Sequence, residues 1–398
     1  MVVAIDSYVS GWLDLVFRWF HVIAAIVWIG TSFYFVALDQ HLHEPREEAD
    51  RERGVGGESW EIHGGGFYRV EKYRIAPRTL PAPLAWFKWE AYTTWLTGFG
   101  LMVLLYYVDP SQYLIDPNRP HFQGWELVIA SIAILIFGWL AYDLLARSIA
   151  KERTLTIAIV VLTVAIAALS GYLFSPRGAF IQVGATLGTW MAANVFFVII
   201  PGQRALVAAT AAGTALDPGP GIRGKQRSVH NNYLTLPVLF AMISQHFPFT
   251  YGHDSSWVVL LAFMALGALV RHAFNLRHQG RDIRRTLGVV VAGGVVLIVA
   301  LAPQPQAAGL TAADFPAVQQ VFQARCVTCH SSHPTNPGFA VAPKGVVFDT
   351  QAEIAANAQR AYEQVVVTKA MPLGNVTGIT DAERDLIGRW VRSGAPAP

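Results

Sequence analysis

The stretch LVFRWFHVIAAIVWIGTSFYFVAL occupies residues 15–38 and contains a single charged side chain, Arg18. A helix needs about 20 apolar residues to cross the hydrocarbon core of a bilayer, so this stretch predicts a transmembrane helix. Of the 398 residues, 53% are hydrophobic and only 14% are charged, whereas a soluble domain has about 25% charged residues. The composition therefore predicts a polytopic membrane protein.

Seven further apolar runs are long enough, or nearly so, to span a bilayer. They occupy residues 84–107, 125–146, 154–174, 183–203, 233–251, 256–277 and 286–302. We therefore expect an all-α fold, in which residues 1–303 form a bundle of about eight transmembrane helices.

The pentapeptide Cys326-Val327-Thr328-Cys329-His330 contains the only two cysteines of the chain. It is the attachment signature of a c-type haem, whose vinyl groups form thioethers with both thiols while the adjacent imidazole ligates the iron. A thioredoxin-like pair would lie near a βαβ pattern, and a zinc site would need a second Cys-x-x-Cys. Neither accompanies the motif. The sequence therefore predicts haem c and an electron-transfer function.

The second axial ligand of this haem is expected to be Met371, because a small cytochrome c usually supplies a methionine from a loop near its C-terminus. Met371 is the only methionine after the motif, and Pro372 follows it in a loop rich in glycine and asparagine. A methionine that fills a gap in the core is the alternative interpretation. His333 is a rival ligand, but it is too close to His330 in sequence to reach the opposite face of the haem easily.

Two helices are expected around the haem motif. One covers residues 315–324, and the other covers residues 381–392 with Thr380 as its N-cap. Residues 309–398 are therefore expected to form a small helical cytochrome c domain, which a linker at 304–308 joins to the membrane bundle.

The basic residues predict the orientation of the bundle. The connections after the first, third, fifth and seventh expected helices contain eighteen lysines and arginines, whereas the alternate connections contain only Arg119 and Arg177. Basic loops remain in the cytoplasm, so the N-terminus and the cytochrome domain are expected in the periplasm of a bacterium, with a long cytoplasmic loop at 39–83. The expected location is the inner membrane. The net charge of +3 resides in these loops and gives no case for nucleic acid.

Two histidines are expected near the outer ends of their helices, His21 on the first and His246 on the sixth. An ionisable group within a span costs a few kcal/mol and is a functional candidate by default. Paired imidazoles from facing helices hold b-type haem in bundles, so haem b is a candidate second cofactor. An interfacial histidine that bonds a backbone carbonyl is the alternative for either residue alone.

Polar residues also gather at the cytoplasmic ends of the expected helices. The long loop contains His-Gly-Gly-Gly-Phe-Tyr at 63–68, whose glycines allow a ligand to approach the backbone closely. Lys88 and Glu90 begin the second span among aromatics, and polar groups occupy 230–233 and 271–278. Snorkelling is the alternative for the cations. All these polar groups are expected at the same depth in the membrane. They therefore predict a pocket with cationic and aromatic walls, which suits a flat heterocyclic anion.

Four stretches, together with the C-terminal Cys-x-x-Cys-His domain, resemble the integral-membrane urate oxidase family, also called cytochrome c urate oxidases or urate hydroxylases. They are HVIAAIVWIG at 21–30, HGGGFY at 63–68, FKWEAY at 87–92 and HNNYLTLP at 230–237. The resemblance covers essentially the whole chain. It implies oxidation of urate to 5-hydroxyisourate in purine catabolism, with electrons leaving through the cytochrome toward the respiratory chain and not directly to O2. The first helix is also similar to that of other small membrane oxidoreductases, which implies that His21 ligates haem b.

Urate is a planar monoanion, and its oxidation would need a cation, a stacking surface and a base. Lys88 is our candidate cation, Trp89 or Tyr92 the stacking surface, and Glu90 or His63 the base. The partners would be urate, the lipid bilayer and a respiratory electron acceptor. The competing function is a non-catalytic electron-transfer subunit that relays electrons from a quinol or a partner enzyme to a cytochrome pool. Such a relay would need neither the glycine-rich loop nor the Lys88/Glu90 pair.

Overall fold

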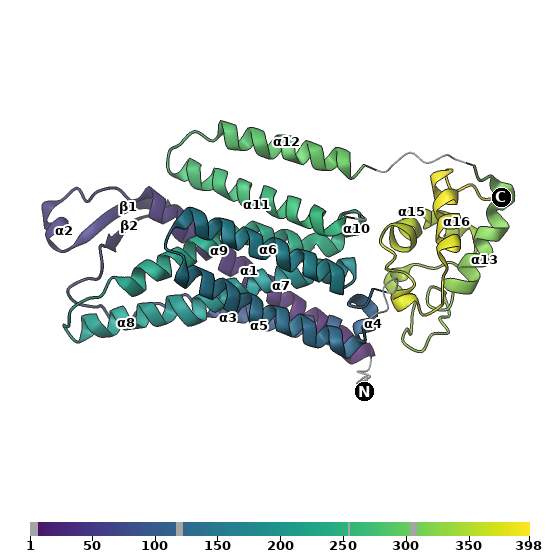
Figure 1. The fold of residues 1–398 in the computed structure, drawn as a ribbon, viewed down its shortest axis with the longest axis horizontal. Coiled ribbons are helices and arrows are strands. Elements are labelled where there is room, and N and C mark those ends of the chain that lie inside the picture. The colour runs from purple at the N-terminus through teal and green to yellow at the C-terminus, as the bar shows by residue number, and fades with distance from the viewer. Residues whose placement is uncertain (1–6, 117–121, 254, 303–308) are drawn as a thin grey trace.

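The computed structural model describes residues 7–116, 122–253, 255–302 and 309–398. It has a bundle of long helices and a smaller helical unit, the C-terminal unit, beside one end of that bundle (Figure 1). A two-stranded hairpin lies at the opposite end, which we call the hairpin end. The expected linker at 304–308 lies outside the described residues.

Each of the eight segments expected to be spans contains a helix, although the second begins at Trp89 and not at residue 84. The first half of the bundle contains α1 (Ser7–His41), α3 (Trp89–Met102) with the π-helical turn η1 (Val103–Tyr107), the short α4 (Pro110–Tyr113), α5 (Gly124–Ser148) and α6 (Glu152–Leu173). The second half contains α7 (Pro176–Asn194), η2 (Val195–Ile199), α8 (Ile200–Ala211), α9 (Gly219–Ile243), η3 (Ser244–His246), α10 (Pro248–Tyr251), α11 (Ser256–His278) and α12 (Arg284–Ala300).

In the described part of the chain, five helices are long and apolar enough to cross a membrane. They are α1, α5, α6, α11 and the continuous helix 176–211 that α7, η2 and α8 form. The other three expected segments are α3 with η1, α9 and α12. These helices are shorter or more polar, since α3 has 14 residues, α12 has 17, and the first turns of α9 are hydrophilic.

Three helices begin at least seven residues earlier than hydropathy predicts, and the first is α1, which begins at Ser7 and not at residue 15. The fifth expected segment begins at Pro176 and not at residue 183, because Ser175 caps it by accepting a hydrogen bond from the Gly178 N–H at 3.0 Å and proline is favoured in the first helical turn. The sixth expected segment is α9, which begins at Gly219 and not at residue 233. Its early turns contain polar side chains that only the packed bundle buries.

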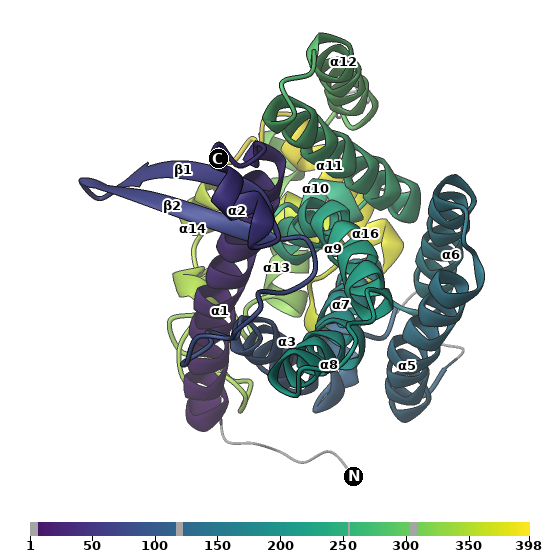
Figure 2. The same cartoon turned by 90° about the vertical axis from the view of Figure 1, so that its left-hand side faces the viewer.

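Small residues bring the central helices into close contact, as is common in membrane bundles. A Cβ at Gly184 of α7 would lie 2.8 Å from the Cβ of Ala241 on α9. On the other side of α9, a Cβ at Gly267 of α11 would lie 3.2 Å from the backbone nitrogen of Pro237. The helix α9 therefore lies between α7 and α11, with α1 and α3 packed together beside them (Figure 2).

The long loop after α1 forms a substructure that the sequence analysis does not predict. It contains α2 (Glu48–Glu52) and the antiparallel strands β1 (Val55–His63) and β2 (Gly66–Tyr73). Gly64 and Gly65 join the strands with φ values of +56° and +82°, as a two-residue hairpin turn of type I′ requires.

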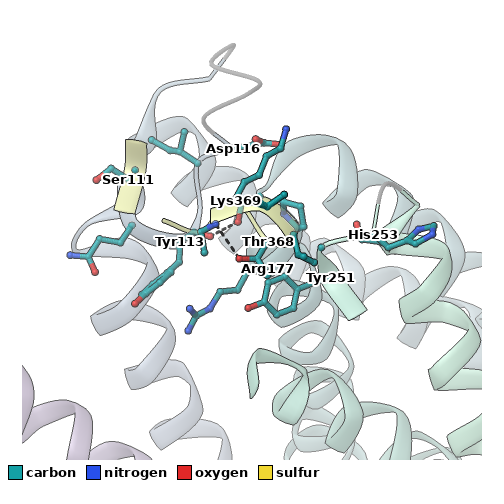
Figure 3. A pocket seen from close by; sticks show the side chains of 18 residues that line it. Ser111, Tyr113, Asp116, Arg177, Tyr251, His253, Thr368 and Lys369 are labelled. Atoms are coloured by element: carbon teal, nitrogen blue, oxygen red, sulfur yellow. Dashed lines mark hydrogen bonds between the residues drawn. The ribbon is translucent and has the colours of Figure 1, made fainter. Parts of the chain in front are cut away.

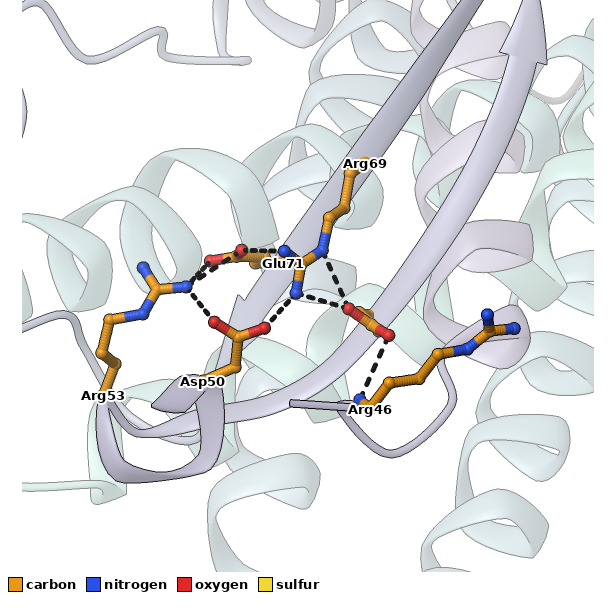
Figure 4. A network of polar contacts seen from close by, with 6 residues as sticks. Arg46, Asp50, Arg53, Arg69 and Glu71 are labelled. Atoms are coloured by element: carbon orange, nitrogen blue, oxygen red, sulfur yellow. Dashed lines mark hydrogen bonds and ion pairs between the residues drawn. The ribbon is translucent and has the colours of Figure 1, made fainter. Parts of the chain in front are cut away.

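Ion pairs hold α2 against this hairpin (Figure 4). Asp50 is almost fully buried and contacts both Arg53 and Arg69. Arg69 also pairs with Glu58 at 2.6 Å, and Arg53 pairs with Glu71 at 3.1 Å. These ion pairs stabilise the loop. None of the four involves the tip of the hairpin at residues 63–66.

The C-terminal unit has its own apolar core, in which Phe322, Ile387 and Trp390 are fully buried. Its helices are α13 (Phe315–Arg325), α14 (Gln351–Ala356), α15 (Ala358–Ala361) with the π-helical turn η6 (Tyr362–Val367), and α16 (Asp381–Arg392); short 3-10 turns are η4 (Ala312–Asp314), η5 (Pro343–Gly345) and η7 (Leu373–Asn375).

The two helices expected here are confirmed. The first ends one residue later than predicted, at Arg325. The second begins at Asp381 with the predicted cap, since Thr380 and Glu383 form a complete capping box.

Replacement of Phe322 by alanine is expected to destabilise the C-terminal unit by about 3–5 kcal/mol, because a fully buried phenylalanine leaves a cavity when it is truncated. Hydrogen-exchange mass spectrometry of the whole protein would detect faster exchange in peptides from α13 and α16. Gln323→Ala, at an exposed neighbouring position, should exchange like the wild type. Equal exchange in both variants would contradict the assigned core.

Candidate functional site

The Cys-x-x-Cys-His motif follows α13 directly and forms a tight turn. The backbone N–H groups of Cys329 and His330 both donate to the carbonyl of Cys326, at 3.1 and 2.9 Å. Both thiols are free, and Cys326 is buried. Burial raises the pKa of the Cys326 thiol to about 12, so the side chain is neutral and apolar there. A thioether is also neutral and apolar, so this position suits a covalently attached haem.

His330 is oriented as an iron ligand requires. Its Nδ1 lies 2.9 Å from the carbonyl oxygen of Val346, and because a carbonyl can only accept, Nδ1 carries the proton. The other ring nitrogen, Nε2, is then left with its lone pair available for a metal. Phe348 fixes the ring from the side, at a centroid distance of 5.5 Å, and its N–H donates to the His330 carbonyl at 3.0 Å.

Met371 packs against the same apolar core as Cys326. Its backbone is held on both sides, because its N–H donates to Gln364 at 2.9 Å and its carbonyl accepts from the buried Arg384 at 2.8 Å. His333, the rival ligand, is exposed at the surface. Met371 therefore packs against the core that contains Cys326, whereas His333 is at the surface, and Met371 stays the predicted second axial ligand.

A cavity of about 390 Å³ lies inside the bundle between α1, α3, α7 and α9, and we call it the bundle cavity. His21 and His246 both line it, so the structure brings together the two histidines that the sequence analysis pairs. The other walls are mainly apolar, and the volume is within the range of small-molecule and cofactor sites.

His21 has a fixed ring with one free nitrogen. Its Nδ1 lies 3.0 Å from the Thr94 carbonyl and 3.2 Å from the Thr97 hydroxyl, which leaves Nε2 for a ligand. The ring fits because residue 98 is glycine, since a Cβ there would lie 2.8 Å from the His21 Cε1. His246 lines the cavity from the turn η3, where it is largely exposed. This donor set suits a flat cofactor such as a b-type haem.

A second cavity of about 310 Å³, the interface cavity, lies between the bundle and the C-terminal unit (Figure 3). The loop after Met371 forms part of this contact, because a Cβ at Gly374 would lie 2.9 Å from the carbonyl oxygen of Ser111 on α4. The expected Met371 ligand loop therefore packs directly on the bundle.

Arg177 connects the two cavities. It lines the interface cavity, where its guanidinium lies 3.9 Å from the ring centroid of Tyr113. Its Nη2 donates to Gln245 at 2.8 Å, and Gln245 lines the bundle cavity beside His246. A single cation therefore lines the interface cavity and is hydrogen-bonded to a residue of the bundle cavity.

Toward the hairpin end, buried polar side chains from α5, α7 and α9 form what we call the Arg227 network. Arg227 is 2% exposed and pairs with Asp143 at 2.7 Å. The adjacent Tyr142 hydroxyl lies 2.8 Å from His230 Nδ1 and accepts from Asn194 at 2.9 Å. The network joins these three helices on the side of the bundle cavity that faces the hairpin end.

A second buried group joins α1, α9 and α11, and we call it the Arg271 cluster. Arg271 donates through Nε to the Asn232 side chain, and its guanidinium lies 3.7 Å from the ring centroid of Phe33. We include in the cluster Asn275, one turn beyond Arg271 on α11, and Gln40, two turns beyond Phe33 on α1, because each has a buried oxygen without a partner among the described residues.

The structure brings Lys88 and Glu90 together with the aromatics predicted beside them. Lys88 is the N-cap residue of α3, and its Nζ lies 5.7 Å from the ring centroid of Trp89. Trp89 in turn contacts Tyr92 edge to face at 5.9 Å. Glu90 is half buried in the first turn, and its Oε2 has no hydrogen-bond partner among the described residues. An unpaired carboxylate oxygen of this kind is available to accept a proton.

His63 lies elsewhere. It pairs with Gly66 at the tip of the hairpin, where it is exposed, and the hairpin projects away from the bundle (Figure 2). Within the described ranges no hydrogen bond or ion pair joins it to Glu90. The geometry therefore favours Glu90 over His63 as the base.

Two features of the Arg227 network were not predicted from the sequence. They are the buried ion pair between Asp143 and Arg227 and the hydrogen bonds that Asn194 donates to Tyr142 and Asn231. A signal existed for two of these residues, because Asp143 and Asn194 fall within apolar runs, where a polar side chain needs a partner. Their partners could not be chosen from sequence, since each lies on another helix.

Comparison with protein families finds that residues 7–302 match the urate oxidase N-terminal family. The chain therefore belongs to this family, which indicates an oxidoreductase with a urate-related function. No curated protein sequence and no solved structure matches the chain. The matched residues include the bundle cavity, the Arg227 network and the Arg271 cluster, and they end before the C-terminal unit.

Acid should weaken the segment that follows the haem motif. The hydroxyl and then the backbone N–H of Ser332 donate to Asp349, at 2.6 and 2.8 Å, and hold the pKa of that carboxyl below its usual value. A carboxyl with a depressed folded-state pKa stabilises the fold above its unfolded pKa of about 3.9, and this contribution disappears as the pH falls through the folded-state value.

Asp349→Asn is therefore expected to reduce the stability of the C-terminal unit at neutral pH, with the difference from wild type narrowing below about pH 4. Hydrogen exchange at a series of pH values would measure this difference in stability between the variant and the wild type. Asp385→Asn, at an exposed carboxylate in α16, is the control. A difference that is constant across the pH range would contradict the linkage.

Proposed function

We propose that the protein is a membrane-bound urate oxidoreductase that forms 5-hydroxyisourate and passes electrons through a fused cytochrome c toward the respiratory chain. The observation that carries this proposal is that His21 and His246 line one cavity. This cavity lies between buried polar clusters on one side and the docked Met371 loop on the other. Family membership supplies urate as the substrate.

The proposed topology has eight spans in residues 1–303, with the N-terminus and the cytochrome domain at 309–398 in the periplasm. Three of these spans would be α3, α9 and α12. Two observations support it: each of the eight expected segments contains a helix, and the hairpin from the basic loop lies at the end opposite the C-terminal unit (Figure 1). The hairpin end would then face the cytoplasm of a bacterial inner-membrane protein.

The reaction converts urate and one water into 5-hydroxyisourate, two protons and two electrons. Glu90 would accept a proton from the water as its oxygen bonds to C5 of the substrate, because its unpaired oxygen is free to do so. Lys88 would attract the anion, and Trp89 and Tyr92 would offer an aromatic face for stacking.

Two cofactors would be held by this chain. Cys326, Cys329, His330 and Met371 fit haem c, and the pair of histidines in the bundle cavity fits haem b. Bound there, the haem irons would supply one-electron carriers for the two electrons of the reaction. The remaining tasks of binding, orientation and proton removal fall to the side chains at the hairpin end.

The decisive experiment adds urate anaerobically to the purified, oxidised protein and follows the haem absorbance. Reduction of the c-type band by urate alone would support the enzyme. If dithionite reduces that band and urate does not, the urate assignment fails for the isolated chain. A quinol added next would then test the relay function, for which the apolar bundle cavity is a suitable site.

The haem b assignment predicts that His246→Ala removes a b-type band while leaving the c-type band in place. His333→Ala is the matched control and should leave both bands unchanged, because this histidine is exposed. A wild-type protein without a b-type band would refute haem b. Loss of the c-type spectrum in His333→Ala would overturn the choice of Met371.

Glu90→Gln keeps the shape of the side chain and removes the base, so urate-dependent reduction of the haem should slow by roughly 10²-fold or more. The urate concentration that gives half the maximal rate should change little. Glu152→Gln, at an exposed acid in the first turn of α6, is the matched control and should react at the wild-type rate. Wild-type rates in Glu90→Gln would remove Glu90 from the mechanism.

A further inference from the structure

The Arg271 cluster contains three buried polar atoms without a partner among the described residues. They are Nη2 of Arg271, Oδ1 of Asn275 and Oε1 of Gln40. Arg271 is 2% exposed and Asn275 is 5% exposed. Buried polar atoms are nearly always hydrogen-bonded, and each exception calls for an explanation, such as a ligand that is not part of the chain.

These atoms belong to facing surfaces of two helices. Arg271 and Asn275 are one turn apart and therefore share a face of α11. Arg271 stacks on Phe33 of α1, and Gln40 lies two turns further along the same face of α1. Both helices run from the C-terminal-unit end to the hairpin end (Figure 1). Gln40 and Asn275 therefore lie on the same side of the contact between Arg271 and Phe33.

Arg271 differs from the other buried arginine of this region. Arg227 is equally buried and also retains an unpaired nitrogen, Nη1, but Asp143 neutralises its charge at 2.7 Å. Arg271 forms no ion pair with any residue that the structure describes, although Asn232 and Phe33 hold its guanidinium in place. A buried cation without a counter-ion is costly, and an anionic ligand would remove that cost.

The unpaired atoms specify the chemistry of the ligand. The guanidinium nitrogen donates to an anionic oxygen, and the two amide oxygens accept from N–H groups. A planar anion with both carbonyl oxygens and ring N–H groups fits this set, and the urate monoanion has both.

We infer that Arg271, Asn275 and Gln40 bind the urate anion, with Asn232 positioning Arg271. This inference rests on the proposed function and assigns recognition of the bound anion to the Arg271 cluster, so that Lys88, Trp89 and Tyr92 would act only in its approach. The cluster is also close to the bundle cavity, since Asn232 lies three residues from Thr235, and both Thr235 and Trp28 line that cavity. At 1.5 Å of rise per residue, the cavity wall is about 5–8 Å along α9 and α1 from Asn232 and Phe33. A substrate held there would be adjacent to the expected haem b.

The first test measures urate binding apart from turnover. Equilibrium dialysis of labelled urate against the dithionite-reduced protein allows binding but not oxidation, because the reduced haems can accept no electrons. Arg271→Gln should weaken binding at least about ten-fold, as expected for loss of a charge-assisted hydrogen bond in a buried site. Arg277→Gln, at an exposed arginine of the same helix, should bind urate like the wild type.

A second variant separates binding from folding. Asn275→Asp is nearly isosteric and supplies a carboxylate one turn from Arg271, so it should keep the fold and the haem spectra. That carboxylate would occupy the place of the anion, and urate binding should fall at least as far as in Arg271→Gln. Asn275→Asp therefore decides the question even if Arg271→Gln does not fold.

The outcomes separate this inference from the function it rests on. If wild-type protein is reduced by urate and both variants bind urate normally, the recognition site is wrong and the enzyme assignment remains. If the wild type neither binds urate nor is reduced by it, the proposed function itself fails. Weak binding in both variants, with normal binding in Arg277→Gln, supports the site.

Discussion

The hydrocarbon interior of a bilayer offers no hydrogen-bond partners, and the arrangement of this bundle depends on that constraint. Several buried polar side chains on the long helices are paired with groups on neighbouring helices. Gln182 on α7, for example, donates to the Ser131 carbonyl on α5 at 3.0 Å, and Arg227 on α9 pairs with Asp143 on α5. Such contacts fix which helices are neighbours, since each polar group has few places where it can be satisfied.

The exceptions to this pairing are therefore informative. Glu90 and the Arg271 cluster retain buried atoms without partners, and both lie toward the hairpin end of the bundle. The Arg227 network, in the same region, also retains two such atoms, Nη1 of Arg227 and Oδ1 of Asn194, but Asp143 neutralises its arginine. The difference between the two groups therefore lies in their charge, since Arg271 has no counter-ion among the described residues.

The opposite end of the bundle is organised around the C-terminal unit. The Met371 loop packs on α4, where Gly374 leaves no room for a side chain beside Ser111. Arg177 lies between the interface cavity and the bundle cavity through its hydrogen bond to Gln245. In the proposed function, this arrangement would place the two haems on one short path from the hairpin end to the outside.

Local signals were sufficient for much of this description. Hydropathy located all eight helical segments, and the cap at Thr380 predicted the start of α16, because both depend on residues close in sequence. Spacing alone identified the Cys326–His330 motif. The hairpin at 55–73 and the polar start of α9 were missed, because their burial comes from other segments and not from their own composition.

The residues of the candidate site also fall into two groups, those that a local sequence pattern predicts and those that only the packing of helices brings together. Sequence by itself predicted the class of protein, located the Cys-x-x-Cys-His motif and supplied the residues that we propose for a flat anion. Only the tertiary structure decided that His21 and His246 line one cavity, that His63 lies away from Glu90, and that Arg271 stacks on Phe33. The residues of two of these pairs, His21 with His246 and Phe33 with Arg271, are more than 200 residues apart in the chain. No local pattern in the sequence shows which helix faces another. The packing of the helices against one another determines which faces meet.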